Sequence, residues 1–303
     1  LGLGRSGMTS ARALNASGAN VICWDDDPEK RSLASSQGLR VIGSVSDFDW
    51  ESIDRLIISP GVPHHFPLPH PMVSAAVSAG VLIDNDVGLF FQSIATKSWD
   101  KFSVRPRIVA VTGSNGKSTT ASLLHHIFLK LGYKSQLAGN IGRGVLDIDP
   151  PENNELIVLE LSSYQIEVAR ILSPDLAIFT NFSADHLERH GGIGGYLAAK
   201  RRLFTEGCPD YSIIGVDELA GLNLAQQLSA SIGDESIIRV SATKQMRRFD
   251  WSIFLDAGYL VEHRKGKQIN STDLKVFDNF VGPHSYQNAA SAYAACRALG
   301  LSP

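Results

Sequence analysis

The stretch "AVTGSNGKSTTASLL" (residues 110–124) joins a short apolar run to a helix-like segment through a turn that contains two glycines. Gly113 and Gly116 come just before Lys117, and three hydroxyl residues follow at positions 118–120. A strand, a glycine turn with a lysine and the start of a helix form a phosphate-binding loop, because the backbone N–H groups and the lysine converge on the phosphates. The order of these features predicts an ATP-binding α/β domain.

The loop departs from the common phosphate-loop pattern GxxxxGK, whose first glycine would fall on Val111. We nevertheless expect Lys117 to lie against the β- and γ-phosphates and the Ser118 hydroxyl to bind Mg²⁺. The alternative is a glycine turn that merely packs a helix on a strand. The loop residues expected to bind ATP are Gly113, Ser114, Asn115, Gly116, Lys117, Ser118 and Thr119.

A second glycine cluster, "LGLGRSG" (residues 1–7), opens the sequence. Its glycines fit the pattern G-x-G-x-x-G, and Asp25 and Asp26 follow the apolar run 21–24 at about the distance where a dinucleotide fold places its ribose-binding acid. An NAD-dependent oxidoreductase is one interpretation. The pattern is weak, however, because any Rossmann-like domain that holds a phosphate at a helix N-terminus has the same turn. Arg5 and Ser6 inside the turn would suit a diphosphate.

Short runs rich in Val, Ile and Leu alternate with helix-like segments, which predicts parallel sheets covered by helices. The runs lie at residues 21–24, 55–61, 81–84, 107–113, 155–161, 176–182 and 211–216. The predicted fold class is α/β, with an N-terminal Rossmann-like parallel-sheet domain (1–96) followed by a P-loop-type α/β ATPase domain (108–303). The polar segment 97–107 is the expected linker. Residues 246–277 predict small antiparallel strands, and a helix that ends near Gly300 should follow them.

The composition excludes several classes of protein. A chain of 303 residues is long enough for two domains with separate cores. A formal net charge of −3 argues against nucleic acid as the main partner, because binding to phosphate backbones needs a concentrated basic surface. The three widely spaced cysteines indicate neither a disulfide framework nor a CxxC metal site, and they favour the cytoplasm. No apolar run has the length of a membrane span, so we expect no membrane insertion.

Polar residues gather where the predicted strands of the second domain end. Glu160 follows the apolar residues 156–159, and Ser162, Ser163 and Gln165 come directly after it. Open α/β sheets bind ligands at the carboxyl ends of their strands, and a carboxylate oxygen is a suitable ligand for Mg²⁺. The alternative is a helix cap made by the two serines, with Glu160 solvated.

The segment "TNFSADHLERHGG" (180–192) holds the next group of candidates. His186 and His190 are four residues apart, but Glu188 does not directly follow His186, so the zinc pattern H-E-x-x-H is absent. We interpret His186 as a ligand of a second Mg²⁺ ion; the alternative is a helix-capping Asp185 with His186 unused. Composition alone assigns no role to Lys200, since a lysine on a helix is usually solvated.

Six segments in this order and spacing resemble the Mur ligase family, the ATP-dependent amide-forming enzymes of peptidoglycan assembly. They are "VTGSNGKSTT" (111–120), "LAGNIG" (137–142), "LELSSYQIE" (159–167), "TNFSADHLERHGG" (180–192), "YLAAKRRLF" (196–204) and "VGPHSYQNAASA" (281–292). The third of these segments and the N-terminal turn are most similar to the members that add D-glutamate.

The resemblance implies a role for each matching residue. ATP phosphates would be held by Lys117 and its loop, one Mg²⁺ by Ser118 and Glu160, and a second by His186 and a carbamylated Lys200. The residues it implies for catalysis are Lys117, Asn140, His186 and Lys200, and the residue near adenine is Asn288. The residues it implies for the UDP-linked substrate are Arg5, Ser6, Asp25, Ser59, Pro60, Gly61, Asn140, Ser162 and Gln165.

The implied reaction joins D-glutamate to UDP-N-acetylmuramoyl-L-alanine at the expense of ATP, in a monomer with Mg²⁺ bound at two sites. The first domain would then hold a UDP-sugar instead of NAD. The family's C-terminal amino-acid-binding domain has no counterpart in the 303 residues, so we expect this chain alone to bind ligands but to be a poor or inactive ligase. A family member with another amino-acid specificity, and a nucleotide-binding regulatory protein, are the alternatives.

Overall fold

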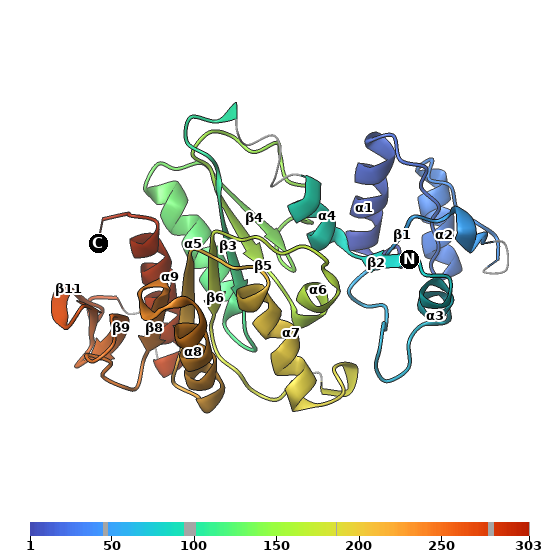
Figure 1. Cartoon of the computed structure of the whole chain (residues 1–303). Helices are drawn as coiled ribbons and strands as arrows, with labels where there is room; N and C mark the ends of the chain where they lie inside the picture. Colours follow the sequence, from blue (N-terminus) through green and yellow to red (C-terminus); the bar gives the residue numbers. More distant parts are fainter. Residues whose placement is uncertain (45–47, 94–100, 186, 278–281, 303) are drawn as a thin grey trace.

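The computed structural model describes residues 1–44, 48–93, 101–185, 187–277 and 282–302. An N-terminal region of small helices and short strands lies beside a larger region built on one extended sheet, and helix α4 lies between them (Figure 1). We call residues 1–93 the N-terminal region and residues 101–302 the large-sheet region. No helix in the described ranges combines the length and the apolar character that crossing a membrane requires.

The N-terminal region contains only short regular elements. Strands β1 (Arg55–Ile57) and β2 (Leu82–Asp84) form a parallel pair, and a single bridge joins Cys23 to Val41. The helices around them are α1 (Arg5–Ala16), α2 (Pro28–Ser36), the 3-10 turn η2 (Trp50–Ser52), α3 (Pro71–Ser78) and α4 (Asp86–Ser93). The N-terminal ends of α2 and α3 are marked by Asp27 and His70, whose side chains accept a backbone N–H, each followed by a proline at the first helical position.

Within the described residues, the large sheet has nine strands in the order β11-β10-β9-β8-β7-β6-β3-β5-β4. The neighbours from β9 to β4 are parallel, whereas β10 is antiparallel to both β9 and β11. The strands are β3 (Arg107–Thr112), β4 (Ser135–Gly139), β5 (Leu156–Glu160), β6 (Leu176–Phe179), β7 (Tyr211–Gly215), β8 (Ile237–Ser241), β9 (Trp251–Asp256), β10 (Tyr259–Arg264) and β11 (Lys267–Asp273).

Helices cover both faces of this sheet (Figure 1). On β3, Ile108 and Ala110 pack into one apolar cluster, and Val109 and Val111 pack into the cluster on the opposite face. Successive side chains of a strand point to opposite faces, so a strand buried on both sides must be apolar throughout. The helices are α5 (Lys117–Lys130) and α9 (Gly282–Ala298) on one face, and α6 (Ser163–Val168), α7 (Ile193–Thr205) and α8 (Leu219–Ile232) with α4 on the other; the 3-10 turns η4 (Leu187–Arg189) and η5 (Asp234–Ser236) lie in the connections.

The predicted α/β class is confirmed, and so are the antiparallel strands within 246–277 and the final helix. The run 21–24 does not form the predicted strand: it makes only the bridge at Cys23. Strands β4 and β8 were not predicted, because Ser, Gln and Gly or a central Arg interrupt their apolar residues. The predicted linker 97–107 lies partly outside the described residues.

Candidate functional site

The glycines of the loop between β3 and α5 are required by close neighbours. A Cβ at Gly113 would collide with the Thr180 hydroxyl, and one at Gly116 would collide with the Asn288 side chain. Gly116 also has a φ of +77°, which side-chain-bearing residues rarely adopt, and it is the residue before the first turn of α5. The contact with Gly116 brings Asn288, predicted near adenine, directly against the loop.

The loop is held in place by the end of the neighbouring strand β6. Asn181 Oδ1 accepts the backbone N–H of Asn115 at 2.9 Å, and the Thr180 hydroxyl donates to the Asn115 carbonyl at 2.7 Å. The Ser114 hydroxyl donates to the Ser183 carbonyl at 3.0 Å. These bonds fix the backbone before any ligand arrives, which is the preorganisation that an anion site needs.

Two lysines approach this loop from different helices. Lys117 Nζ donates to the Ser114 carbonyl at 2.8 Å, and Lys200 Nζ donates to the Gly113 carbonyl at 2.8 Å. Lys200 is only 1 % exposed; burial and the nearby charge of Lys117 lower its pKa to about 7, against the opposing effect of Asp185. Burial also lowers the pKa of Lys117. The site therefore concentrates cationic groups that an anionic ligand would stabilise.

A buried carboxylate at the end of β5 lies close enough to Lys117 for its charge to act on it. Glu160 is 1 % exposed, and its charge acts on Lys117. Its Oε1 accepts the Asn140 side-chain amide at 3.3 Å, whereas its buried Oε2 has no hydrogen-bond partner among the described residues. A buried carboxylate oxygen left without a partner is costly, and a hard cation would satisfy it. The donor set therefore fits Mg²⁺. The alternative of a solvated Glu160 is wrong.

The remaining predicted residues of this region have different surroundings. Ser118 and Thr119 are exposed on the first turn of α5, next to Lys117. Ser162 is the N-cap of α6, and it forms a reciprocal capping box with the buried Gln165. The predicted capping alternative is thus confirmed for Ser162. His186 lies outside the described residues.

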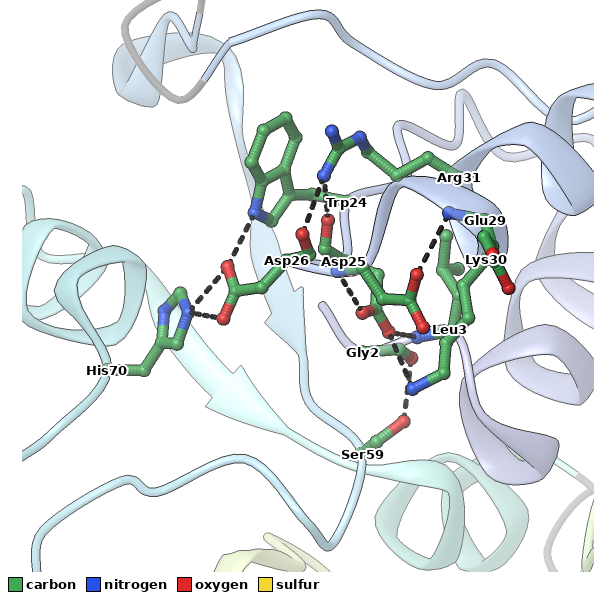
Figure 2. A network of polar contacts seen from close by, with 11 residues as sticks. Gly2, Leu3, Trp24, Asp25, Asp26, Glu29, Lys30, Arg31, Ser59 and His70 are labelled. Carbon is green, nitrogen blue, oxygen red and sulfur yellow. Dashed lines mark hydrogen bonds and ion pairs between the residues drawn. The ribbon is translucent and has the colours of Figure 1, made fainter.

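The N-terminal glycine turn is packed much more tightly than its sequence pattern requires. A Cβ at Gly7 would collide with the Gly2 carbonyl, and one at Gly2 would collide with the Ser59 side chain. The Ser59 hydroxyl donates to the Gly2 carbonyl at 2.7 Å (Figure 2). The first and last glycines of the pattern therefore serve close packing of helix, turn and the 59–61 segment.

Asp25 is largely occupied by the backbone of the same region. Its Oδ2 accepts the N–H of Leu3 at 2.6 Å and its Oδ1 accepts the N–H of Asp27 at 2.9 Å, while Lys30 Nζ lies 3.8 Å away (Figure 2). The neighbouring Asp26 side chain is 73 % exposed and pairs with His70 at 3.0 Å. The more available carboxylate beside the turn is thus that of Asp26, which the sequence pattern offered together with Asp25 but which the resemblance did not assign to the substrate.

A cavity of about 450 Å³ opens at this turn, and its lining includes all six residues predicted for the UDP end of the substrate. These are Arg5, Ser6, Asp25, Ser59, Pro60 and Gly61. A cavity of about 820 Å³ lies elsewhere in the N-terminal region, but none of the predicted site residues lines it. The larger cavity is therefore not the one that the predicted polar residues line.

Arg5 connects the N-terminal turn to the large-sheet region. Its guanidinium donates to the Asn140 carbonyl at 2.8 Å and reaches the carbonyls of Gly139 and Gly142 at 3.5 and 3.4 Å. Asn140 in turn contacts Glu160. The two groups of predicted residues are thus joined through the 139–142 segment, although they are far apart in sequence.

Several residues at the loop were missed by sequence reasoning. Thr180 and Asn181 follow β6, and their position after an apolar run was a usable signal, because parallel strands place ligands at their carboxyl ends. Tyr196 lies four residues before Lys200 on α7, a spacing that puts both on one helix face. Its ring lies 4.4 Å from Lys200 Nζ, and its hydroxyl is 3.2 Å from that of Ser114.

Comparison with known proteins agrees with these observations. Residues 111–296 match the Mur ligase middle domain family. The chain is 56% identical over 303 residues to the UDP-N-acetylmuramoylalanine--D-glutamate ligase of Cereibacter sphaeroides (strain KD131 / KCTC 12085), and 56% identical over 303 residues to the protein of the same name from Ruegeria pomeroyi. Both alignments cover 100% of this chain but only 65% of the relative.

Two solved structures have a similar fold. The UDP-N-acetylmuramate:L-alanyl-gamma-D-glutamyl-meso-diaminopimelate ligase from Neisseria meningitides superposes with a TM-score of 0.57 at 17% identity, covering 99% of this chain and 92% of that one. A UDP-N-acetylmuramoyl-L-alanyl-D-glutamate--2,6-diaminopimelate ligase gives a TM-score of 0.55 at 19% identity, covering 76% and 54%. At these identities the likeness concerns the fold alone.

Proposed function

The chain belongs to the Mur ligase family, and from this premise we propose that it is the nucleotide- and acceptor-binding part of a UDP-N-acetylmuramoyl-L-alanine:D-glutamate ligase. The observation that carries the proposal is the convergence of Lys117 and Lys200 on one preorganised loop, with the charge of the buried Glu160 acting on Lys117. Among the residues that the structure describes, Oε2 of Glu160 has no hydrogen-bond partner. The relatives at 56% identity carry this ligase name, and the chain spans 65% of their length.

The proposed reaction must activate a carboxylate, because its oxygen is a poor leaving group. Transfer of the γ-phosphoryl group of ATP to the muramoyl-alanine carboxylate gives an acyl phosphate and ADP. The amine of D-glutamate then attacks the acyl carbon, the amide forms, and inorganic phosphate and a proton are released. Lys117 and the N–H groups of the loop would stabilise negative charge during the transfer, which is mainly a matter of positioning and electrostatics.

Mg²⁺ would be held by Glu160 and Ser118, with a second ion at His186 and Lys200, and when bound it would neutralise charge on the phosphates. The second site is proposed to use a carbamate on Lys200, since an uncharged buried amine can add CO₂ and become an oxygen ligand. The burial of Lys200 and its contact with the Gly113 carbonyl support this placement beside the phosphates. Asn140 would orient the Glu160 carboxylate through its amide.

We assign the UDP end of the acceptor to domain 1–96 and ATP to domain 108–303, joined by the linker 97–107. The cavity lined by Arg5, Ser6 and the 59–61 segment supports the first assignment, and the contact of Asn288 with Gly116 supports the second. Ser162 and Gln165 would contact the muramoyl-alanine end of the acceptor, between the UDP site and the ATP site. The proposed protein acts as a cytoplasmic monomer, and the D-glutamate site would lie in the further length that the relatives have.

A phosphate-release assay on the longer protein tests the proposal. With ATP, Mg²⁺ and UDP-N-acetylmuramoyl-L-alanine, we expect phosphate release with D-glutamate and not with L-alanine or a diamino acid. Release with another amino acid and its matching UDP-muramoyl acceptor would assign a different member of the family. An absence of release in every combination, together with saturable NAD binding followed by fluorescence, would overturn the proposal in favour of an oxidoreductase.

A further inference from the structure

His190 is a buried histidine that the proposed reaction does not use. Its side chain is 0% exposed, and its Nε2 lies 2.9 Å from the Ser163 hydroxyl on α6. Its Nδ1 lies 2.9 Å from Oε2 of Glu167, at the other end of the same helix. The two atoms lie at ion-pair distance without hydrogen-bond geometry, and the negative charge of the carboxylate favours the proton on Nδ1, which leaves Nε2 to accept from Ser163. One ring thus contacts α6 at two points, through a hydrogen bond to Ser163 and an electrostatic contact with Glu167.

The partner of His190 also faces the N-terminal region. Oε2 of Glu167 lies 3.5 Å from Nε2 of His64, which belongs to the segment that follows the predicted substrate residues 59–61. Contacts with His190 and His64 lower the pKa of Glu167 although burial acts to raise it, so the carboxylate is favoured in its charged form. Glu167 is therefore an anion that faces His190 and also the ring of His64, whose pKa burial lowers to about 4, so that the His64 ring is uncharged near neutral pH.

The turn that carries His190 makes two further contacts with the same segment. The Arg189 guanidinium donates to the Gly61 carbonyl at 3.1 Å, and a Cβ at Gly191 would collide with the Phe66 ring. The rings of Tyr164 and His190 are stacked with centroids 5.1 Å apart. Residues on both sides of His190 thus touch the N-terminal region.

A cavity lies beside the contacts between the segment 61–66 and helix α6. It has a volume of about 470 Å³, and His64, His65 and Glu167 line it together with residues of α3. Close packing is what normally fixes the distance between two elements. Since packing is incomplete beside His64 and His65, the contacts through Glu167 and Arg189 act together with the Phe66–Gly191 contact to hold the segment 61–66 against α6 and its neighbouring turn.

We infer that His190 is a positioning residue: through Glu167 it sets the distance between the segment 59–66 and helix α6, and thereby the affinity for a UDP-linked acceptor that spans the two. The inference rests on the proposed function. Such an acceptor would run from the cavity at Gly61 to the capping box of Ser162 and Gln165. The binding of both of its ends therefore depends on the distance between the segment 59–66 and α6. ATP binds on the loop after β3 and does not cross it.

The test separates the two contacts of the ring. In His190→Gln the amide reproduces Nε2 and keeps the Ser163 contact, whereas in His190→Asn it reproduces Nδ1 and keeps the Glu167 contact. Binding of UDP-N-acetylmuramoyl-L-alanine and of ATP·Mg²⁺ to the 303-residue chain is measured by calorimetry. His126→Gln, on the exposed side of α5, is the matched control.

We expect His190→Gln to raise the Kd for the UDP ligand about tenfold, the size of one lost charge-assisted contact, with the Kd for ATP within twofold of wild type. His190→Asn and His126→Gln should remain within about twofold for both ligands. Glu167→Met, which removes the carboxylate and keeps a side chain of similar length, should reproduce the loss, and adding it to His190→Gln should cost nothing more, because both remove the His190–Glu167 contact.

If both His190 variants lose the same affinity for the UDP ligand and also bind ATP more weakly, the role of His190 is merely structural and the inference is overturned. An unchanged Kd for the UDP ligand in His190→Gln would also overturn the inference. If the wild-type chain bound ATP·Mg²⁺ but not the UDP ligand, the proposed function itself would fail. The two failures are therefore distinguishable. Thermal unfolding of each variant identifies any general loss of stability.

Discussion

The two glycine turns of this protein look alike in sequence and differ in what surrounds them. Both open a helix, α1 in the first case and α5 in the second. In the first turn the glycines at 2 and 7 meet each other and Ser59, while in the second the glycines at 113 and 116 meet Thr180 and Asn288. In both turns the glycine spacing indicates that other atoms approach the backbone closely. It does not indicate which ligand either turn binds.

The difference lies in the cations. The first turn has Arg5, whose guanidinium is directed at carbonyls of the 139–142 segment, so it also ties two regions together. The second has Lys117 and the buried Lys200, each bonded to a loop carbonyl. The charge of Glu160 acts on Lys117, and Oε2 of Glu160 has no hydrogen-bond partner within the described part of the chain. The comparison teaches that charges from distant helices, more than the glycines, make a loop suitable for a triphosphate and metal.

The largest expected effect is that of removing the lysine of the second turn. Lys117→Ala in the longer protein should lower ATP-dependent amide formation on the order of 10³-fold, because a preorganised cation at the transferring phosphoryl group is lost. Lys130→Ala, exposed in the last turn of the same helix, is the control. Undiminished turnover in the phosphate-release assay would remove the phosphate-loop assignment.

The second lysine should be nearly as important. Lys200→Ala is expected to lose at least about 100-fold in turnover, and added formate or acetate should restore part of it by supplying the missing anionic oxygens. Arg201→Ala, on the exposed side of α7, should change little. A Lys200→Ala variant with near-wild-type rates and no response to carboxylates would contradict the carbamate proposal.

Replacing glycines of the first turn tests whether packing explains its pattern. Gly7→Ala should destabilise the protein by about 2 kcal/mol, because its Cβ would overlap the Gly2 carbonyl. Gly4→Ala should stay within about 0.5 kcal/mol, since Gly4 has a φ of −69° and open space around its Cβ position. Urea unfolding measures both, and equal stabilities would contradict the packing explanation.

The buried amine should also be visible in the pH dependence of stability. The pKa of Lys200 falls from 10.5 to about 7 on folding, so above pH 7 the unfolded state binds more protons and stability rises with pH. Between pH 7 and 8 the free energy of unfolding of the ligand-free chain should gain about 1 kcal/mol from this group. Lys200→Met should remove that gain in denaturant titrations; an identical pH profile would contradict it.

The elements of the large-sheet region were largely predictable because strands buried on both faces must be apolar throughout. Strands β3, β5, β6 and β7 were found on that basis. The strand expected at 21–24 was wrong, and β4 was missed, because the pairing of a short segment depends on which neighbour the fold brings to it. A similar limit applied to Tyr196, whose proximity to the loop is a tertiary fact, whereas the place of Asn181 directly after an apolar run was a signal that could have been used.

The sequence by itself determined the α/β class, the loop with Lys117 and the family, since local order and spacing along the chain carry that information. Tertiary structure decided which charges meet there: it buried Lys200 against the Gly113 carbonyl, left one Glu160 oxygen without a hydrogen-bond partner among the described residues, and turned Arg5 toward the 139–142 segment. The physical reason is that burial and distance control electrostatics, and neither can be read from spacing along a chain.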